Sequence, residues 1–403
     1  MNAGDTVFVL ISAALVMLMT PGLALFYGGM VRNKNVLGTI MQSFILLGII
    51  TIEWVLIGYS MSFGPDIGGI IGNLDFFALK DVGMDPKEGS TIPHLAFMIF
   101  QCMFAILTPA LITGAFAERM KFSAFLIFSL LWAVLVYNPL CHWAWGGGWM
   151  GSDGALDFAG GTVVHISSGS AALIAALMIG KRKGYGSARY IPHNLPMTII
   201  GTGLLWFGWF GFNAGSALAC NGLAANAFVV THISSAVAAL TWVLAEWIHS
   251  GKPTTLGAAS GAVAGLVAIT PACGYVSPVS SIIIGGVAGV LCFGGIMLKG
   301  KLGYDDSLDV VGIHGIGGIW GALATGLFAS KAINSGAADG LFYGNPGQLW
   351  TQFISVIATM AFSFVMTFII MKVIDLTVGL RVSPEDEERG LDISLHNETG
   401  YNA

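Results

Sequence analysis

Two histidines in apolar surroundings are the residues of this sequence best placed to do chemistry. His165 ends the block Asp-Phe-Ala-Gly-Gly-Thr-Val-Val-His that begins at Asp157, and His314 ends the block Asp-Val-Val-Gly-Ile-His that begins at Asp309. Ionisable residues inside apolar segments are functional candidates. Two adjacent neutral imidazoles can share a proton, one acting as donor and the other as acceptor. A single membrane histidine is more often a packing residue, but two at related positions favour a functional pair.

Four other features of the apolar segments need an interpretation. An aspartate at a helix start usually accepts hydrogen bonds from free backbone N–H groups; we interpret Asp309 in this way, and Asp157 either in this way or as part of a site. Small residues after each histidine let helices approach closely in lipid. His232 has no counterpart and is interpreted as a packing residue. Glu53 is predicted to be protonated or paired in a helix interface, with no functional role assigned.

Aromatic clusters give a second signal. Phe100 and Phe104 are spaced i, i+4 and therefore share a helix face. The segment 206–216 reads Trp-Phe-Gly-Trp-Phe-Gly-Phe-Asn-Ala-Gly-Ser, and Trp145 precedes three glycines. Such stripes are usually packing or a membrane-interface belt. An externally placed Trp can also bind a small cation on its π face, with a nearby hydroxyl as hydrogen-bond acceptor.

The elements that position these residues follow from the composition. Of 403 residues, 55% are hydrophobic and 10% charged, with a mean hydropathy of +0.79, whereas soluble domains carry about 25% charged residues. A helix needs about 20 apolar residues to cross a membrane, and long continuous segments exclude a barrel. We predict an all-α integral membrane protein with eleven transmembrane helices. They are placed at 6–30, 36–63, 94–116, 122–142, 160–180, 195–215, 222–248, 255–270, 276–298, 310–330 and 347–373.

Basic residues set the orientation of these helices. With the N-terminus outside, 14 of the 17 lysines and arginines fall in inner loops, which satisfies the positive-inside rule. Those inside are Arg32, Lys34, Arg119, Lys121, Lys181, Arg182, Lys183, Arg189, Lys252, Lys299, Lys301, Lys372, Arg381 and Arg389; Lys80, Lys87 and Lys331 lie outside. The outer loop 64–92 is acidic, with Asp66, Asp75, Asp81, Asp85 and Glu88. This loop is either a solvated segment or a means of enriching cations near an entrance.

The eleven helices divide as five, five and one. Two five-helix blocks must have opposite orientations, as in inverted-repeat transporters. We predict a transmembrane transport domain over 1–375 and a cytoplasmic tail over 376–403. The N-terminus lacks the basic region of a signal peptide, so the first apolar segment is predicted to be retained. The five cysteines show no CxxC spacing and are interpreted as small buried hydrophobes, so no metal and no cofactor is expected.

At 157–169, 206–216 and 309–320 the chain resembles the ammonium transporter family, the relatives of Rh proteins, and the resemblance extends over nearly all of it. The block at 157–166 is similar to the family signature. The segments Thr-Pro-Ala-Cys-Gly at 270–274 and Gly-Ala-Phe-Ala-Glu-Arg at 114–119 match family segments as well. Such proteins are homotrimers in the plasma (cytoplasmic or inner) membrane, with one pore in each subunit.

The resemblance implies a role for each candidate residue. Trp145, Phe104 and Ser216 would form an outer ammonium site, supported by Asp157 without direct contact with the ion. Phe104 and Phe212 would form a stacked phenyl constriction, and His165 and His314 the paired imidazoles of a narrow hydrophobic pore. The residues implied to shape the vestibule or the inner path are Phe100, Trp209 and Thr270. The tail would pack on the inner face and take part in regulation, with a PII-type signalling protein as its implied bacterial partner.

Physical chemistry is consistent with this path. Ammonium is close to potassium in size, so selection by size alone would discriminate poorly, whereas its N–H donors can select a hydroxyl and aromatic faces. A bare cation in an apolar pore is penalised by several kcal/mol or more, roughly. We therefore expect recruitment of NH4+, deprotonation near the phenyl constriction and conduction of NH3, with a proton relayed separately by the histidines as an open alternative.

Other classes of function are less consistent with the residues. An ammonium sensor or receptor is one alternative, although the short tail contains no recognisable enzyme or kinase domain. A Rh-like gas channel for ammonia or carbon dioxide is another. A cation-coupled transporter for a larger solute would need a charged substrate site, and none is visible. An enzyme is not expected without an HExxH, metal-cluster or nucleophile-elbow motif, and the net charge of -5 gives no reason to expect a nucleic-acid partner.

Overall fold

Ten helices in the described part of the chain are long and apolar enough to cross a membrane. The structure is a computed structural model that describes residues 1–87, 89–187 and 190–401. Two of the sequence-based predictions, the inner position of Arg189 and the place of Glu88 in the acidic loop, lie outside these residues. The predicted all-α membrane fold is confirmed.

The α-helices are α1 (Ala3–Met30), α2 (Val36–Glu53), α3 (Tyr59–Phe63), α4 (His94–Phe116), α5 (Phe122–Trp132), α6 (Asn138–Trp145), α7 (Trp149–Ser152), α8 (Ser167–Ile179), α9 (Leu195–Gly215), α10 (Gly222–Ser250), α11 (Thr255–Ile269), α12 (Pro278–Leu302), α13 (Ile316–Phe328), α14 (Pro346–Thr377), α15 (Pro384–Arg389) and α16 (Leu391–His396). Four π-helical turns lie within or at the start of spans: η2 (Trp54–Gly58), η4 (Ala133–Tyr137), η5 (Gly161–Ile166) and η6 (Val311–Gly315). The 3-10 turns η1 (Asn33–Asn35), η3 (Phe77–Leu79) and η7 (Leu341–Tyr343) and the antiparallel strands β1 (Asp66–Ile67) and β2 (Ile71–Gly72) lie in loops.

The predicted eighth span, 255–270, is not among these ten helices and corresponds to α11, which has only 15 residues. At 1.5 Å per residue this helix is about 22 Å long, shorter than the hydrocarbon core. Its side chains are almost all buried, because α11 packs between α9, α10, α12 and α13. The turn that follows bonds to other loops, through Phe158 N–H to Pro271 O and Ser330 N–H to Tyr275 O. A helix enclosed by protein is not required to match the bilayer thickness, which explains why it is short.

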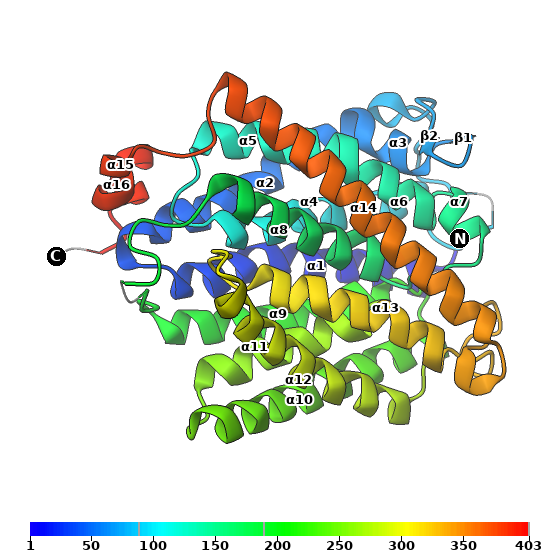
Figure 1. Cartoon of the computed structure of the whole chain (residues 1–403). Coiled ribbons are helices and arrows are strands. Elements are labelled where there is room, and N and C mark those ends of the chain that lie inside the picture. Colours follow the sequence, from blue (N-terminus) through cyan, green and yellow to red (C-terminus); the bar gives the residue numbers. More distant parts are fainter. Residues whose placement is uncertain (88, 188–189, 402–403) are drawn as a thin grey trace.

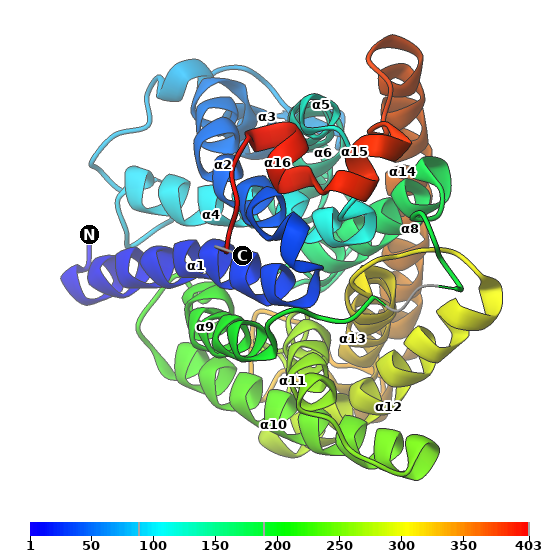
Figure 2. The same cartoon turned by 90° about the vertical axis from the view of Figure 1, so that its left-hand side faces the viewer.

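The helices run between two faces that carry opposite ends of the chain (Figure 1). We call them the N-terminal face, with the β1–β2 hairpin and α7, and the C-terminal face, with α15 and α16. Figure 1 also shows α14 running diagonally across the molecule, where it packs on α5, α8 and α13. Seen from the C-terminal face, α2, α4, α5 and α8 lie on one side and α9 to α13 on the other (Figure 2). Because α14 packs on helices of both halves, it holds the two halves together.

The two histidine-bearing segments have the same construction. Each begins with a π-turn that contains the histidine, η5 or η6, and continues as an α-helix of 13 residues, α8 or α13. A Cβ atom at Gly169 of α8 would lie 2.3 Å from the backbone nitrogen of Gly315 in η6. Only glycine permits this approach, so the small residues bring the two helices together as predicted.

A network of buried ions closes the C-terminal face. The Glu118 carboxylate accepts hydrogen bonds from the Arg32 side chain at 3.0 Å and from Arg182 at 3.0 Å, and Arg182 also contacts Asp305 at 2.8 Å. Burial alone would raise the pKa of Glu118, but the hydrogen bonds and charges of the two arginines lower it below its usual range. Buried charges of this kind persist only when they are paired. The network therefore holds four connections of the chain in one position, those that contain Arg32, Glu118, Arg182 and Asp305.

The tail packs against this network. Glu387 of α15 contacts Arg381 at 2.7 Å and accepts the Lys183 backbone N–H at 2.6 Å. The Asp392 carboxylate accepts the N–H groups of Leu37 and Gly38 at 3.0 and 2.8 Å. A carboxylate of α16 therefore occupies the N-terminus of α2, where free N–H groups and the helix dipole favour an anion.

Glu53 is buried and hydrogen-bonded in an interface between two helices, which is one of the two states predicted for it. Its Oε1 accepts a hydrogen bond from Asn138 Nδ2 at 2.8 Å. Glu53 immediately precedes η2 and Asn138 immediately follows η4, so this bond joins the second and fourth spans at their π-turns. The contact lies outside the cavities described below and is interpreted as structural.

We expect Glu53→Ala to lower the stability by about 0.5–2 kcal/mol, because the Asn138 amide loses its acceptor inside the membrane region. The measurement is the unfolding temperature of the purified protein in detergent. Glu53→Gln is the matched control, since it keeps a carbonyl oxygen for Asn138 and should unfold close to the parent. Equal unfolding temperatures for the parent and the alanine variant would show that the bond contributes nothing.

Candidate functional site

A cavity of about 210 Å³ near the N-terminal face brings together three predicted site residues. Phe104 of α4, Trp145 at the end of α6 and Ser216 after α9 all line it. The Phe104 and Trp145 rings meet edge to face, with centroids 6.0 Å apart. Ser216 Oγ donates to Phe212 O at 2.8 Å, which leaves its lone pairs free to accept. The cavity therefore offers aromatic faces and a hydroxyl acceptor to a small cation.

Below this cavity the two predicted constriction residues are in contact. The Phe104 and Phe212 rings have centroids 4.2 Å apart and are inclined by 32°. Their side chains are almost completely buried. Phe104 also lines the cavity, so the pair lies at the cavity wall.

The two histidines meet directly on the far side of the phenyl pair. His165 Nδ1 lies 3.2 Å from His314 Nδ1, and the rings are nearly parallel with centroids 5.3 Å apart. One Nδ1 must donate and the other accept, so the two imidazoles have different tautomers. His165 Nε2 has no hydrogen-bond partner in the described structure. The two imidazoles are therefore in contact, and one ring nitrogen of His165 has no partner among the described residues.

Asp157 links the cavity to the histidines. Its carboxylate accepts hydrogen bonds from the backbone N–H groups of Gly160, Gly161, Thr162 and Val163 and from the Thr162 hydroxyl. These donors form the start of η5, which carries His165. The Asp157 carbonyl oxygen accepts the Trp145 indole N–H at 2.8 Å. Asp157 is thus both a helix cap and the support of the cavity's tryptophan.

The prediction that Asp309 caps the second histidine segment is wrong. Asp309 has a positive φ of 63°, and its carboxylate contacts Lys299. Asp306 caps η6 instead, since its Oδ2 accepts the Val311 N–H at 2.8 Å. At an ordinary helix start the capping residue directly precedes the helix. Here the π-turn η6 and the left-handed residue Asp309 before it move the cap farther from His314. The sequence did contain the signal: Asp306 stands eight residues before His314, as Asp157 stands eight before His165.

The remaining candidates surround this line of rings. Phe100 packs on Phe104 with centroids 5.0 Å apart, but does not line the cavity. Trp209 lies parallel to His165 at 5.5 Å, and its Nε1 donates to Thr270 Oγ1 at 2.9 Å. Trp209 and Thr270 therefore lie beside the histidines.

His232 is not part of this site. Its ring packs on Trp206 and Phe210 with centroids 5.4 and 6.2 Å apart. The residue itself is exposed on the surface of the single chain. It lies on the surface formed by α9 and α10. The interpretation as a packing residue therefore holds only for the part of the ring that contacts Trp206 and Phe210.

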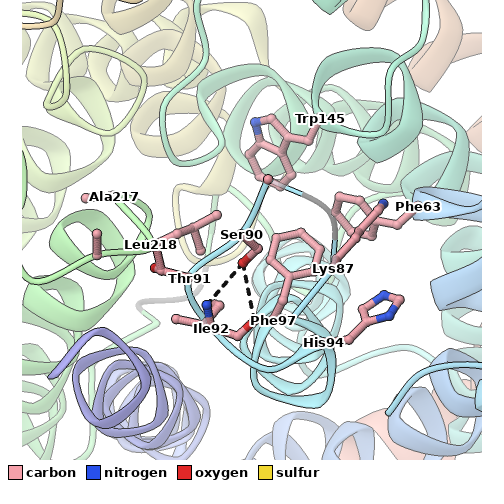
Figure 3. Close-up of a pocket in the computed structure, with 12 residues that line it drawn as sticks. Phe63, Lys87, Ser90, Thr91, Ile92, His94, Phe97, Trp145, Ala217 and Leu218 are labelled. Carbon is pink, nitrogen blue, oxygen red and sulfur yellow. Dashed lines mark hydrogen bonds between the residues drawn. The ribbon is translucent and has the colours of Figure 1, made fainter. Parts of the chain in front are cut away.

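Sequence reasoning missed most of the cavity wall. Besides the predicted residues, the lining consists of Phe63, Phe97, Gln101, Phe158 and Leu218. A second cavity of about 380 Å³ shares Phe63, Phe97, Trp145 and Leu218 with it (Figure 3). The figure also shows Lys87, Ser90 and His94 around this second space. Gln101 could have been found from its type, as the one amide in the apolar segment 94–116.

Comparison with known proteins identifies the class of protein to which these features belong. The sequence model of the Ammonium Transporter Family matches residues 7–401. The ammonium transporter of Bacillus subtilis is 57% identical over 403 residues, which cover 100% of this chain and 99% of that protein. Ammonium transporter Amt1 of Archaeoglobus fulgidus is 51% identical over 402 residues, the whole length of both chains.

Solved structures agree with the sequence relatives. Mep2 of Candida albicans superposes with a TM-score of 0.91 at 37% identity, covering 96% of this chain and 88% of that one. A structure described as a sensor Amt protein matches with a TM-score of 0.89 at 30% identity, covering 98% of each chain. The cavity, the phenyl pair and the histidine pair therefore lie in a chain that belongs to the ammonium transporter family.

Proposed function

We propose that this chain recruits NH4+ in the cavity lined by Trp145, Phe104 and Ser216, deprotonates it at the phenyl pair and conducts NH3 past the histidines. The observation that supports the proposal is a continuous row of neighbouring aromatic and imidazole side chains. Trp145 contacts Phe104, Phe104 contacts Phe212, the Phe212 ring centroid lies 6.2 Å from that of His165, and His165 contacts His314. This row of rings extends from the cavity into the interior between the two halves of the molecule.

Recruitment depends on directed donors. An ammonium ion has four N–H groups, and a cation is attracted to the faces of aromatic rings. The indole N–H of Trp145 is occupied by Asp157, so this side chain offers its ring rather than a competing donor. Ser216 accepts a hydrogen bond from the ion while its own hydrogen stays on Phe212 O. Asp157 holds the arrangement without touching the ion.

Deprotonation at the phenyl pair follows from the cost of desolvation. Beyond Phe104 and Phe212 the path has apolar rings and neutral imidazoles. A bare cation there would lose roughly several kcal/mol of solvation free energy. Neutral ammonia loses far less. In the tautomer in which His165 donates through Nδ1 to His314, its free Nε2 supplies a hydrogen-bond acceptor to an ammonia molecule that has passed the phenyl pair.

The histidine pair also offers a route for the proton. The Nδ1–Nδ1 contact at 3.2 Å permits a proton to move from one ring to the other. If it does, ammonia and a proton cross on adjacent routes and transport moves charge. If it does not, the proton released from NH4+ returns to water on the entry side, and the same path conducts net ammonia.

Orientation and location are part of the proposal. We assign the N-terminal face to the outside and the C-terminal face to the cytoplasm, with the chain in the plasma (cytoplasmic or inner) membrane. Arg32, Arg119, Arg182, Lys183 and Arg381 all lie at the C-terminal face, in accord with the positive-inside rule. Ammonium then enters from the face that carries the cavity.

We further propose a homotrimer with one pore in each subunit. Its support is the α9–α10 surface, on which Phe207 and Phe228 are 55% and 45% exposed and His232 is exposed among them. An imidazole that faced hydrocarbon would have an unsatisfied polar atom at a cost of several kcal/mol, roughly. A second subunit covering this surface would remove that cost.

The tail, 376–403, is proposed as a regulatory element distinct from the transport domain, 1–375. Its support is the contact of α15 and α16 with the loops at the C-terminal face, through Glu387 and Asp392. A PII-type signalling protein at this face is the proposed bacterial partner. Docking of the tail then sets the position of the loops around the inner end of the path.

The proposed function is tested by ammonium gradients across proteoliposomes, with current and internal pH recorded and methylammonium and potassium as comparisons. Ammonium-selective current supports a transporter that moves charge. Dissipation of the gradient without current supports net ammonia conduction, the behaviour of a Rh-like gas channel. Binding without flux would contradict the proposal and favour a sensor, the word used for one structural relative.

We expect the double variant His165→Leu, His314→Leu to reduce the ammonium-driven current at least tenfold, because apolar side chains cannot relay a proton. His249→Ala is the matched control: this histidine packs on Phe293 near the end of α10 and should leave the current unchanged. Current and ammonium selectivity equal to those of the parent would rule out the relay.

We expect Asp392→Ala to release α16 from α2 and to accelerate tryptic cleavage at Arg381 and Arg389 about fivefold or more, the effect of losing a helix cap of about 1 kcal/mol. Digestion of the purified protein followed by mass spectrometry measures this. Asp375→Ala, at an exposed position of α14, is the control. A tail that regulates would also change the transport rate when released, and an unchanged rate would limit it to a structural role.

A further inference from the structure

Gln101 is a buried amide in the wall of the recruitment cavity with an unpaired atom. It lies on α4 one turn before Phe104, lines the cavity together with Trp145 and Ser216, and is only 8% exposed. Its Oε1 has no hydrogen-bond partner among the described residues. Nine-tenths burial of an amide without a partner is unusual, because an unmet hydrogen bond costs about 1–3 kcal/mol.

The neighbouring polar residues of the same helix show what a purely structural side chain does. Thr108 Oγ1 donates to Phe104 O at 2.7 Å, and Thr113 Oγ1 donates to Ala110 O at 2.7 Å. Both hydroxyls are satisfied within α4 itself. Gln101 has no such bond within α4, and its side chain lines the cavity instead, with Oε1 enclosed by protein in the present orientation of the amide.

We propose that Gln101 is a further ammonium ligand, which presents its amide oxygen to the ion opposite the Ser216 hydroxyl. The proposal rests on the proposed function of the cavity. Rotation about the last side-chain bond exchanges the amide oxygen and nitrogen, so the same position of the side chain can direct the oxygen to the ion. The ion would then donate to two oxygens and place its remaining N–H groups on the Phe104 and Trp145 rings.

This assignment gives the cavity a means of choosing ammonium over potassium. Potassium ions are held in selective filters by rings of carbonyl oxygens that replace the whole hydration shell. Two oxygens and two aromatic faces replace only a fraction of that shell. An ammonium ion instead needs one acceptor for each N–H group, and two directed oxygens together with π faces meet that need.

The test is the concentration dependence of ammonium-driven current in proteoliposomes. Gln101→Leu keeps the side-chain volume and removes both polar atoms. We expect its half-saturating ammonium concentration to rise about tenfold, the loss of one hydrogen bond to a charged partner, with the maximal current within about twofold of the parent. Gln101→Glu retains an acceptor at the same distance and should restore half-saturation to the parental value or below it.

Gln42→Leu is the matched control. Gln42 of α2 is also buried with an unpaired Oε1, but it lines none of the cavities described above. Its half-saturation should equal that of the parent. If Gln101→Leu does not fold, Gln101→Asn withdraws the amide by one methylene and should also raise the half-saturating concentration.

The outcomes separate this proposal from the one on which it rests. A parent protein without ammonium flux contradicts the proposed function. A conducting parent whose half-saturation is unchanged by Gln101→Leu, or changed equally by Gln42→Leu, overturns the role of Gln101 and leaves the function intact. An increase confined to Gln101 variants that remove the acceptor, with rescue by Gln101→Glu, supports it.

Discussion

The hydrogen bonds of Asp157 are the interaction on which the rest of the path depends. A carboxylate that is 8% exposed beside apolar helices is stable only if its charge is fully paired. Asp157 meets this requirement with four backbone N–H groups and one hydroxyl, all at the start of η5. The same residue holds the Trp145 ring through its carbonyl oxygen. The electrostatic need of one carboxylate therefore sets the position of the cavity wall and of the segment that bears His165.

The second half of the chain repeats this device with one difference. Asp306 caps η6 and stands eight residues before His314, and α13 has the same length as α8. The contact of Gly169 with Gly315 then brings the two halves into register, so that the histidines meet. Asp306 differs from Asp157 in keeping Oδ1 without a partner in the described structure. Burial raises its pKa to about 6, so the cap at this end of the path titrates closer to neutrality.

Hydropathy and residue pattern predicted those features that can be recognised within a single stretch of sequence. The spans could be placed because the length of each apolar run can be counted. The short helix α11 was predicted as a span like the others, because its enclosure by α9, α10, α12 and α13 cannot be read from one segment. The histidine pair could be predicted from two similar blocks. The sequence points to Asp309 because an ordinary cap is adjacent to its helix, whereas the π-turn and the left-handed residue shift the cap to Asp306. Phe63, Phe97, Phe158 and Leu218 come from four separate segments, so only the packed structure shows that they share a cavity.

On the proposed function, the polar atoms along the path differ on the two sides of the point where the substrate changes its charge. Before the phenyl pair, the side chains of Ser216 and Gln101 offer oxygens, which suit a cation with N–H donors. After it, a ring nitrogen of His165 is free, and a neutral imidazole nitrogen accepts a hydrogen bond from ammonia without requiring a charge. Phe104 and Phe212 separate the two regions with tilted rings that provide no hydrogen bond. A cation is thus stabilised up to the gate and not beyond it, which favours loss of the proton at that point rather than earlier or later.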